Sequence, residues 1–241
     1  TSDTVMTRIV LRLFPDVVDL PLRPPAMLAK AAATLDIISG GRIELGLGAG
    51  AFWEAIEAMG GPVRTPHEAV AALEEAIHVI RLMWSGQRGL RYEGQHYSLK
   101  GVHSGPVPAH PIGLWIGAYG PKMLALTGRL GDGWVPSSSY AAPGELPEMH
   151  KRIDEAALSA GRDPAAIQRI YNIMGQIKAG PPAEPFNGPV EQWVDELTGL
   201  ALEYGMDTFI LGLPEPPGDQ IERFIAEVAP RVRENVARQR S

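Results

Sequence analysis

The run GGRIELGLGAG, residues 40–50, decides how the rest of the chain is interpreted. It predicts a turn, a short buried strand over residues 42–45, and then glycines at alternate positions, Gly46, Gly48 and Gly50. Glycine permits a positive φ and lets backbone N–H groups approach a bound molecule closely. We interpret the stretch as a site for a cofactor phosphate or ring. The alternative is a tight strand-to-helix turn that binds nothing.

The same glycines also match the dinucleotide-binding pattern G-x-G-x-x-A, over residues 46–51. That pattern needs an acidic residue about 20 positions further on, at the end of the next strand. The sequence has a helix start there instead, Thr65-Pro66-His67-Glu68, which is a capping box with proline at the first helical position. We therefore discount a dinucleotide site.

The composition is that of a globular protein with a sizeable core, because 45% of the 241 residues are hydrophobic and 21% are charged. The formal net charge of −6 argues against non-specific binding to nucleic acid or to anionic membranes. The sequence has no cysteine, which excludes disulfides and thiolate chemistry and fits a cytoplasmic enzyme. We expect no membrane span and no leader peptide.

Buried strands alternate with helices along the chain, which predicts a parallel α/β fold in a single domain, residues 1–241. An open doubly wound sheet and a closed barrel both fit this alternation. Glycines follow the strands at Leu45, Ile116 and Leu211, and a site built from many strand ends is typical of a barrel. The expected strands are 8–13, 42–45, 112–117, 133–136, 167–177 and 207–211, and the expected helices are 26–38, 65–84, 121–130, 146–159, 189–204 and 219–237. Residues 87–111 should form an irregular excursion with a hairpin at 91–97.

Four segments together resemble the bacterial-luciferase-like flavin monooxygenase superfamily, especially its branch that uses the deazaflavin coenzyme F420. They are residues 21–36, the run 39–50, Gly131-Asp132-Gly133-Trp134, and residues 188–210. The resemblance covers nearly the whole chain and implies a (β/α)8 TIM-barrel type of fold. It implies an oxidoreductase or monooxygenase that binds F420, or alternatively flavin mononucleotide (FMN), at the carboxyl ends of the strands.

The sequence departs from this family in its number of strands. About six barrel strands are expected here against eight in a complete barrel, and by the resemblance the first two β/α units are missing. A fragment of a longer protein, a natural truncation, and a barrel closed by a second copy all remain open. Under the resemblance, the chain transfers a hydride between the deazaflavin ring and a small organic substrate. The alternative is a truncated, non-catalytic flavin-binding protein of the same fold.

The resemblance also implies which residues bind the cofactor. Asp16 and Val17 fall where the family has a bulge with a non-prolyl cis peptide; alternatively, Pro15 simply bends an edge strand. A second loop would begin the helix at Pro121, where backbone N–H groups attract phosphate, with ordinary glycine-turn structure as the alternative. Ser137 could bind phosphate or substrate, or belong to a polar loop. The predicted cofactor-binding residues are Asp16, Val17, Gly46, Gly48, Ala49, Gly50, Gly117, Ala118, Tyr119, Gly120, Lys122, Met123 and Ser137.

Few ionisable side chains qualify for acid/base catalysis. Some deazaflavin dehydrogenases have a glutamate after the glycines, where this chain has Ala51, and the nearest carboxylate is Glu54. Glu54 and His67 are therefore the only catalytic candidates, and each has a structural alternative on a solvated helix. His96, His103 and His110 are widely spaced in an irregular loop and match no metal pattern, so we expect no metal. The expected partners are a small-molecule substrate and, from the resemblance, a second copy in a homodimer.

Overall fold

The computed structural model describes residues 12–182, 184–212 and 218–240. It divides into two compact units, Thr1–Gly117 and Ala118–Ser241, and each is described by itself. Within the described residues, no helix combines the length and the apolar character needed to cross a membrane.

Three parallel strands form the sheet of the first unit, in the order β1, β2, β5. They are β1 (Val18–Asp19), β2 (Leu45–Gly48) and β5 (Leu114–Ile116). Val18 pairs with Leu47 and Leu45 pairs with Leu114, so β2 lies in the middle and is buried along its whole length. The short 3-10 helix η1 (Leu20–Leu22) follows β1 directly.

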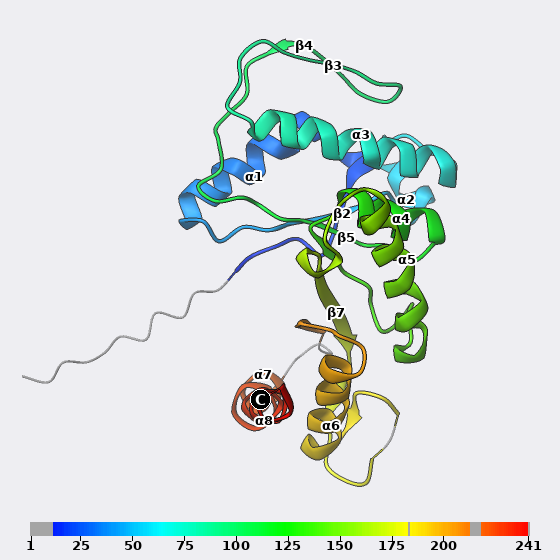
Figure 1. Cartoon of the computed structure of the whole chain (residues 1–241), viewed down its shortest axis with the longest axis vertical. Helices are drawn as coiled ribbons and strands as arrows, with labels where there is room; N and C mark the ends of the chain where they lie inside the picture. Colours follow the sequence, from blue (N-terminus) through cyan, green and yellow to red (C-terminus); the bar gives the residue numbers. More distant parts are fainter. Residues whose placement is uncertain (1–11, 183, 213–217, 241) are drawn as a thin grey trace, which may run out of the picture. The chain divides into compact units, whose positions relative to one another are not determined.

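Helices α1 (Pro25–Ser39) and α3 (Pro66–Trp84) pack side by side in this unit (Figure 1). Helix α1 ends as predicted at Gly40, which adopts the left-handed conformation with φ 72°. Helix α3 begins with the predicted capping box, in which Thr65 and Glu68 each accept a hydrogen bond from the other's backbone. The short helix α2 (Trp53–Ala58) lies between them in sequence.

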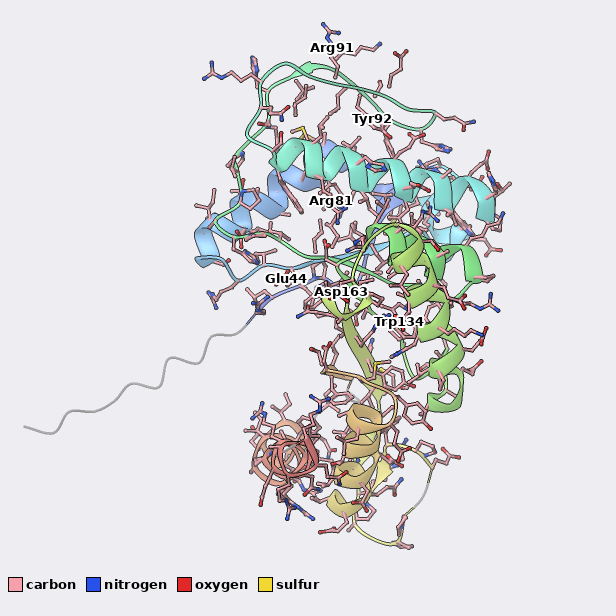
Figure 2. All side chains as sticks on the ribbon, viewed as in Figure 1. Glu44, Arg81, Arg91, Tyr92, Trp134 and Asp163 are labelled. Carbon is pink, nitrogen blue, oxygen red and sulfur yellow. The ribbon has the colours of Figure 1, made fainter. Side chains whose placement is uncertain are left out.

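The predicted excursion contains a hairpin of β3 (Leu90–Glu93) and β4 (Ser98–Val102). Its turn is held by the carboxylate of Glu75 on α3, which accepts hydrogen bonds from the backbone N–H groups of residues 95–97 at 2.7–2.9 Å. Successive strand residues point to opposite faces, so Arg91 points away from α3 and Tyr92 points towards it (Figure 2).

The second unit has three parallel strands in the order β6, β7, β10. They are β6 (Gly133–Trp134), β7 (Gln168–Met174) and β10 (Thr208–Gly212). Helices α4 (Pro121–Leu130) and α5 (Leu146–Ser159) pack against each other, and α6 (Val190–Leu202) packs against α8 (Ala229–Arg240). Shorter pieces complete the unit: the 3-10 helices Pro143–Glu145 and Pro164–Ala166, strands β8 (Gln176–Ile177) and β9 (Asn187–Gly188), helix α7 (Gln220–Arg223), and the π-helical turn Phe224–Val228.

Several predicted element bounds were wrong. The strand expected at 42–45 runs from Leu45 to Gly48, so two glycines lie inside it. The strand expected at 167–177 is interrupted at Gly175, where the carbonyl oxygen of Phe186 approaches too closely to leave room for a Cβ. A short strand not expected from the sequence, β9, follows it, and the expected helix 219–237 is divided by the π-helical turn. Residues 8–11 of the first expected strand lie outside the described residues.

Candidate functional site

A bulge precedes β1, and it contains the cis peptide that the resemblance predicted. The peptide bond between Asp16 and Val17 is cis, and neither residue is proline. Before it, Leu13 forms an isolated parallel bridge with Ile43, and the ring of Phe14 packs 4.8 Å from that of Trp115. The chain therefore enters the bulge from the sheet and returns to the sheet immediately afterwards at Val18.

The glycines of β2 make room for this bulge. A Cβ on Gly46 would overlap the carbonyl oxygen of Pro15, and a Cβ on Gly48 would lie 2.9 Å from Cγ2 of Val17. Gly117, at the end of β5, lies next to the same side chain, 3.5 Å from its Cγ2 by the same construction. Three of the predicted cofactor-binding glycines thus surround Val17, and two of them are needed by the bulge itself.

The chain turns sharply after β2, at Ala49 and Gly50. Gly50 has φ 119°, a conformation that side chains disfavour. A Cβ there would lie 2.5 Å from Cη2 of Trp53 and 2.9 Å from Cγ of Pro21. The indole of Trp53 therefore packs on the turn, and Pro21 of η1 packs beside it.

Asp16 is the carboxylic acid that the structure places in the bulge. Although the residue as a whole is exposed, partial burial of its carboxyl group raises the pKa above its ordinary value. The two predicted catalytic candidates lie elsewhere: Glu54 is in the first turn of α2 and His67 in the first turn of α3, and both are exposed. Among the described residues, no group of three side chains is suited to hold a metal ion.

The remaining predicted residues come together in the second unit. The hydroxyl oxygen of Tyr119 accepts a hydrogen bond from the backbone N–H of Ser137 at 3.0 Å, and its ring meets that of Tyr140 edge-on at 5.7 Å. The carbonyl of Ala118 accepts a 2.9 Å hydrogen bond from the indole N–H of Trp134. The segments 118–123 and 137–140 are thus joined by one hydrogen bond and one ring contact.

Helix α4 begins in the first of these loops with Gly120 as its N-cap. No described side chain caps its first turn, and the position of a Cβ on Gly120 has no described atom within 4 Å. Lys122 is exposed and Met123 is half-buried in that turn. Uncapped N–H groups at a helix start favour an anion electrostatically, so this turn could accept a phosphate.

The first unit also contains a cluster of ionisable side chains that no sequence pattern indicated: Asp36 and Glu44, which are buried, and His110, which is half-buried. Asp36 is fully buried and accepts hydrogen bonds from Nδ1 of His110 at 2.8 Å and from three backbone N–H groups. Glu44 accepts a hydrogen bond from the backbone N–H of Gly113 at 2.6 Å and pairs with Arg12. The cluster lies at the amino end of β2, which in barrels contributes to stability. No spacing rule joins residues 36 and 110.

Comparison with known proteins places this arrangement in a family. Residues 10–179 match the family described as luciferase-like monooxygenase. The chain belongs to that family. The fold of this luciferase-like protein is accordingly α/β of the TIM-barrel type, as the sequence predicted. A solved F420-dependent secondary alcohol dehydrogenase, in complex with an F420–acetone adduct, superposes with a TM-score of 0.81 at 21% identity, over 92% of this chain and 79% of its own.

The curated proteins similar to this luciferase-like chain include an F420-dependent dehydrogenase and a ketoreductase. An F420-dependent glucose-6-phosphate dehydrogenase of Gordonia bronchialis is 33% identical over 150 residues, which is 62% of this chain and 44% of that protein. A phthiodiolone/phenolphthiodiolone dimycocerosates ketoreductase of Mycobacterium kansasii is 36% identical over 164 residues, which is 65% of this chain and 42% of that protein. The chain thus spans less than half the length of these relatives.

Proposed function

We propose that this protein is an F420-dependent oxidoreductase that transfers a hydride between the deazaflavin ring and a small organic substrate, with FMN as the alternative cofactor. One observation carries the proposal: the bulge at residues 15–17 is packed against the glycines of β2, in a chain whose relatives include an F420-dependent dehydrogenase. Val17 and the backbone of the bulge would support one face of the bound ring.

When bound, F420 would accept or donate the hydride, which carries two electrons. The chain's own residues then have to bind and orient the coenzyme and the substrate. They also have to transfer one proton, because oxidation of an alcohol releases a proton as well as a hydride. The carboxyl group of Asp16, with its raised pKa, is suited to take up or return that proton. The first turn of α4 would bind the coenzyme phosphate through backbone N–H groups, with Lys122 beside them.

The test is a fluorescence and absorbance titration of the purified chain with F420 and, separately, with FMN. We expect F420 to bind, and the Lys122→Gln variant to bind it about 3- to 10-fold more weakly through the loss of one charge contact. Lys151→Gln, an exposed lysine on α5, is the matched control and should bind normally. Reduction of bound F420 by an alcohol would establish hydride transfer. Binding of neither cofactor would overturn the proposal.

A second candidate function is a non-catalytic flavin-binding protein of the same fold. It is favoured by Ala51, which by the resemblance stands where some deazaflavin dehydrogenases have a glutamate, and by the solvent-exposed positions of Glu54 and His67. Cofactor binding without turnover of alcohols, ketones or activated alkenes would support this candidate. Homodimer formation also remains a proposal, which sedimentation at micromolar concentrations would decide.

A further inference from the structure

A small cavity of about 290 Å³ lies in the first unit, apart from the bulge. Its walls come from η1, from the segment after α2, and from the hairpin turn. Most of its lining is apolar, including Pro21, Leu22 and Met59, and its polar side chains include Arg64 and Tyr97. A concave apolar site with a few polar groups is the usual form of a small-molecule pocket.

Arg64 has an unused hydrogen-bond donor in this pocket region. Its Nη2 donates to the hydroxyl oxygen of Tyr97 at 3.3 Å, and its guanidinium carbon lies 5.7 Å from the centre of the Tyr97 ring. Its Nη1 is buried and has no hydrogen-bond partner among the described residues. A buried charged donor without an acceptor is unfavourable, and native proteins rarely leave one unsatisfied.

The nearby acid, Glu68, does not satisfy this donor. Its Oε2 accepts hydrogen bonds from the backbone N–H and the hydroxyl of Thr65, at 2.8 and 2.7 Å, and thereby caps α3. Glu68 therefore contributes its charge to the surroundings of Arg64 but leaves Nη1 without an acceptor. A hydrogen-bond acceptor on a bound molecule would satisfy Nη1 of Arg64.

We propose that the Arg64–Tyr97 pocket is a binding subsite for the carboxylate of an organic acid. Arginine presents planar donors that match a carboxylate, the phenol of Tyr97 adds a further polar group, and the proline, leucine and methionine walls suit an apolar body. Pro21 also packs at the Gly50 turn, so the pocket adjoins the end of β2. The inference therefore deepens the proposed function and rests on it for the source of the carboxylate. That source is either the acidic side chain of the coenzyme or a carboxylate-bearing substrate.

The first test measures binding of benzoate by nuclear magnetic resonance titration, with benzamide as the uncharged analogue. We expect benzoate to bind and benzamide to bind at least tenfold more weakly. Arg64→Gln should weaken benzoate binding about 10- to 100-fold, and Tyr97→Phe several-fold, since charge-assisted hydrogen bonds are lost. Arg88→Gln, which removes an exposed arginine from the same unit, is the control and should bind as the wild type does. Equal binding of benzoate by wild type and both pocket variants would overturn the proposal.

The second test separates the two sources and compares F420 with the deazaflavin chromophore that lacks the acidic side chain. If Arg64→Gln weakens binding of F420 but not of the chromophore, the coenzyme supplies the carboxylate. If Arg64→Gln weakens only the binding of benzoate, the substrate supplies the carboxylate. Arg64-dependent benzoate binding in a chain that binds neither F420 nor FMN would uphold the subsite and overturn the proposed function. Cofactor binding with no effect of Arg64→Gln on benzoate or F420 would overturn the subsite alone. Because Tyr97→Phe keeps the ring, it tests the pocket even if Arg64→Gln lowers the melting temperature.

Discussion

At the scale of single residues, the site depends on the absence of two side chains. Gly46 and Gly48 are buried in the central strand of their unit, where a β-branched residue would normally be favoured. Their missing Cβ atoms leave space for the carbonyl oxygen of Pro15 and for the side chain of Val17. The glycines therefore allow the bulge to pack against β2. They would affect a bound ligand only indirectly, by fixing the position of the Val17 side chain.

Gly46→Ala should therefore destabilise the protein by about 2 kcal/mol, because backbone atoms cannot move aside as a flexible side chain can. Gly199→Ala is the matched control: it lies within α6, has no described atom within 4 Å of its Cβ position, and should stabilise by about 0.5–1 kcal/mol. Urea unfolding followed by circular dichroism measures both changes. An unchanged unfolding midpoint for Gly46→Ala would show that the bulge adapts to a methyl group.

Asp16 should show the cost of keeping a carboxyl group partly buried. Because its pKa is raised in the folded state, the folded state binds the proton more tightly, and stability falls as pH rises through that pKa. Asp16→Asn should therefore be more stable than wild type at pH 7 and should lose the part of the pH dependence above pH 4. Asp195→Asn, an exposed residue of α6, should change neither. The measurement is the free energy of unfolding between pH 3 and 7.

If Asp16 carries the substrate proton, Asp16→Asn should also lower the rate of F420 reduction while leaving F420 binding within about threefold of wild type. The combination of higher stability and lower turnover is typical of a residue kept for function. Unchanged turnover would remove Asp16 from the acid/base role and leave Glu54 and His67 as the predicted candidates.

At the scale of elements, α3 organises the segments around it. Its first turn is fixed by the Thr65–Glu68 capping box, and its middle carries Glu75, whose carboxylate holds the hairpin turn. Desolvation opposes ionisation of Glu75, but hydrogen bonds from the backbone N–H groups of the turn outweigh it and lower its pKa. One carboxylate on a rigid helix thus positions the loop that contributes Tyr97 to the pocket.

Glu75→Gln should loosen this turn without unfolding α3, because an amide offers one uncharged acceptor in place of two charged ones. Hydrogen exchange of residues 94–98 should accelerate at pH 7, and Glu57→Gln, on the exposed part of α2, should leave it unchanged. In the wild type the anchoring is complete above the ordinary glutamate pKa and is lost as pH falls through the lowered value. Equal exchange in both variants would contradict the anchoring role.

At the scale of the whole molecule, the sequence predicted what depends on local patterns. Helix bounds followed from Gly40, Thr65 and Pro121, where capping and backbone chemistry act within a few residues. The cis peptide and the family followed from resemblance. The distant pairings could not be predicted, because nothing in the spacing connects Pro15 with Gly46, Asp36 with His110, or Arg64 with Tyr97. The strand break at Gly175 was missed for the same reason.

Acid should destabilise the protein through His150, a half-buried residue of α5. Burial, with a smaller contribution from the charge of Arg169, lowers the pKa of His150 to about 4. Its ring lies edge-on to the indole of Trp134, labelled in Figure 2, with the ring centres 5.1 Å apart. The unfolded state therefore takes up a proton near pH 6.5 that the folded state resists, and stability falls as pH drops from 6.5 towards 4.

His150→Leu should remove this pH dependence. The lowered pKa of His150 sets an upper limit of about 3 kcal/mol on the loss of folding free energy. His67→Leu, at an exposed position of α3, should keep it. Chemical unfolding at half-unit pH steps measures the slope for each protein. If the free energy of unfolding of His150→Leu depends on pH as steeply as that of the wild type, other groups cause the acid sensitivity.

The overlap that a side chain at position 46 would create with Pro15 also constrains how the family can diverge. A descendant that replaced this glycine would have to lose the bulge in the same step or soon after, since an added Cβ and the Pro15 carbonyl oxygen cannot occupy the same space. Chains that keep the bulge at positions 15–17 should therefore also keep a glycine at position 46. In any aligned set of relatives, chains with a bulky residue in the middle of this strand should be those that have abandoned the bulge.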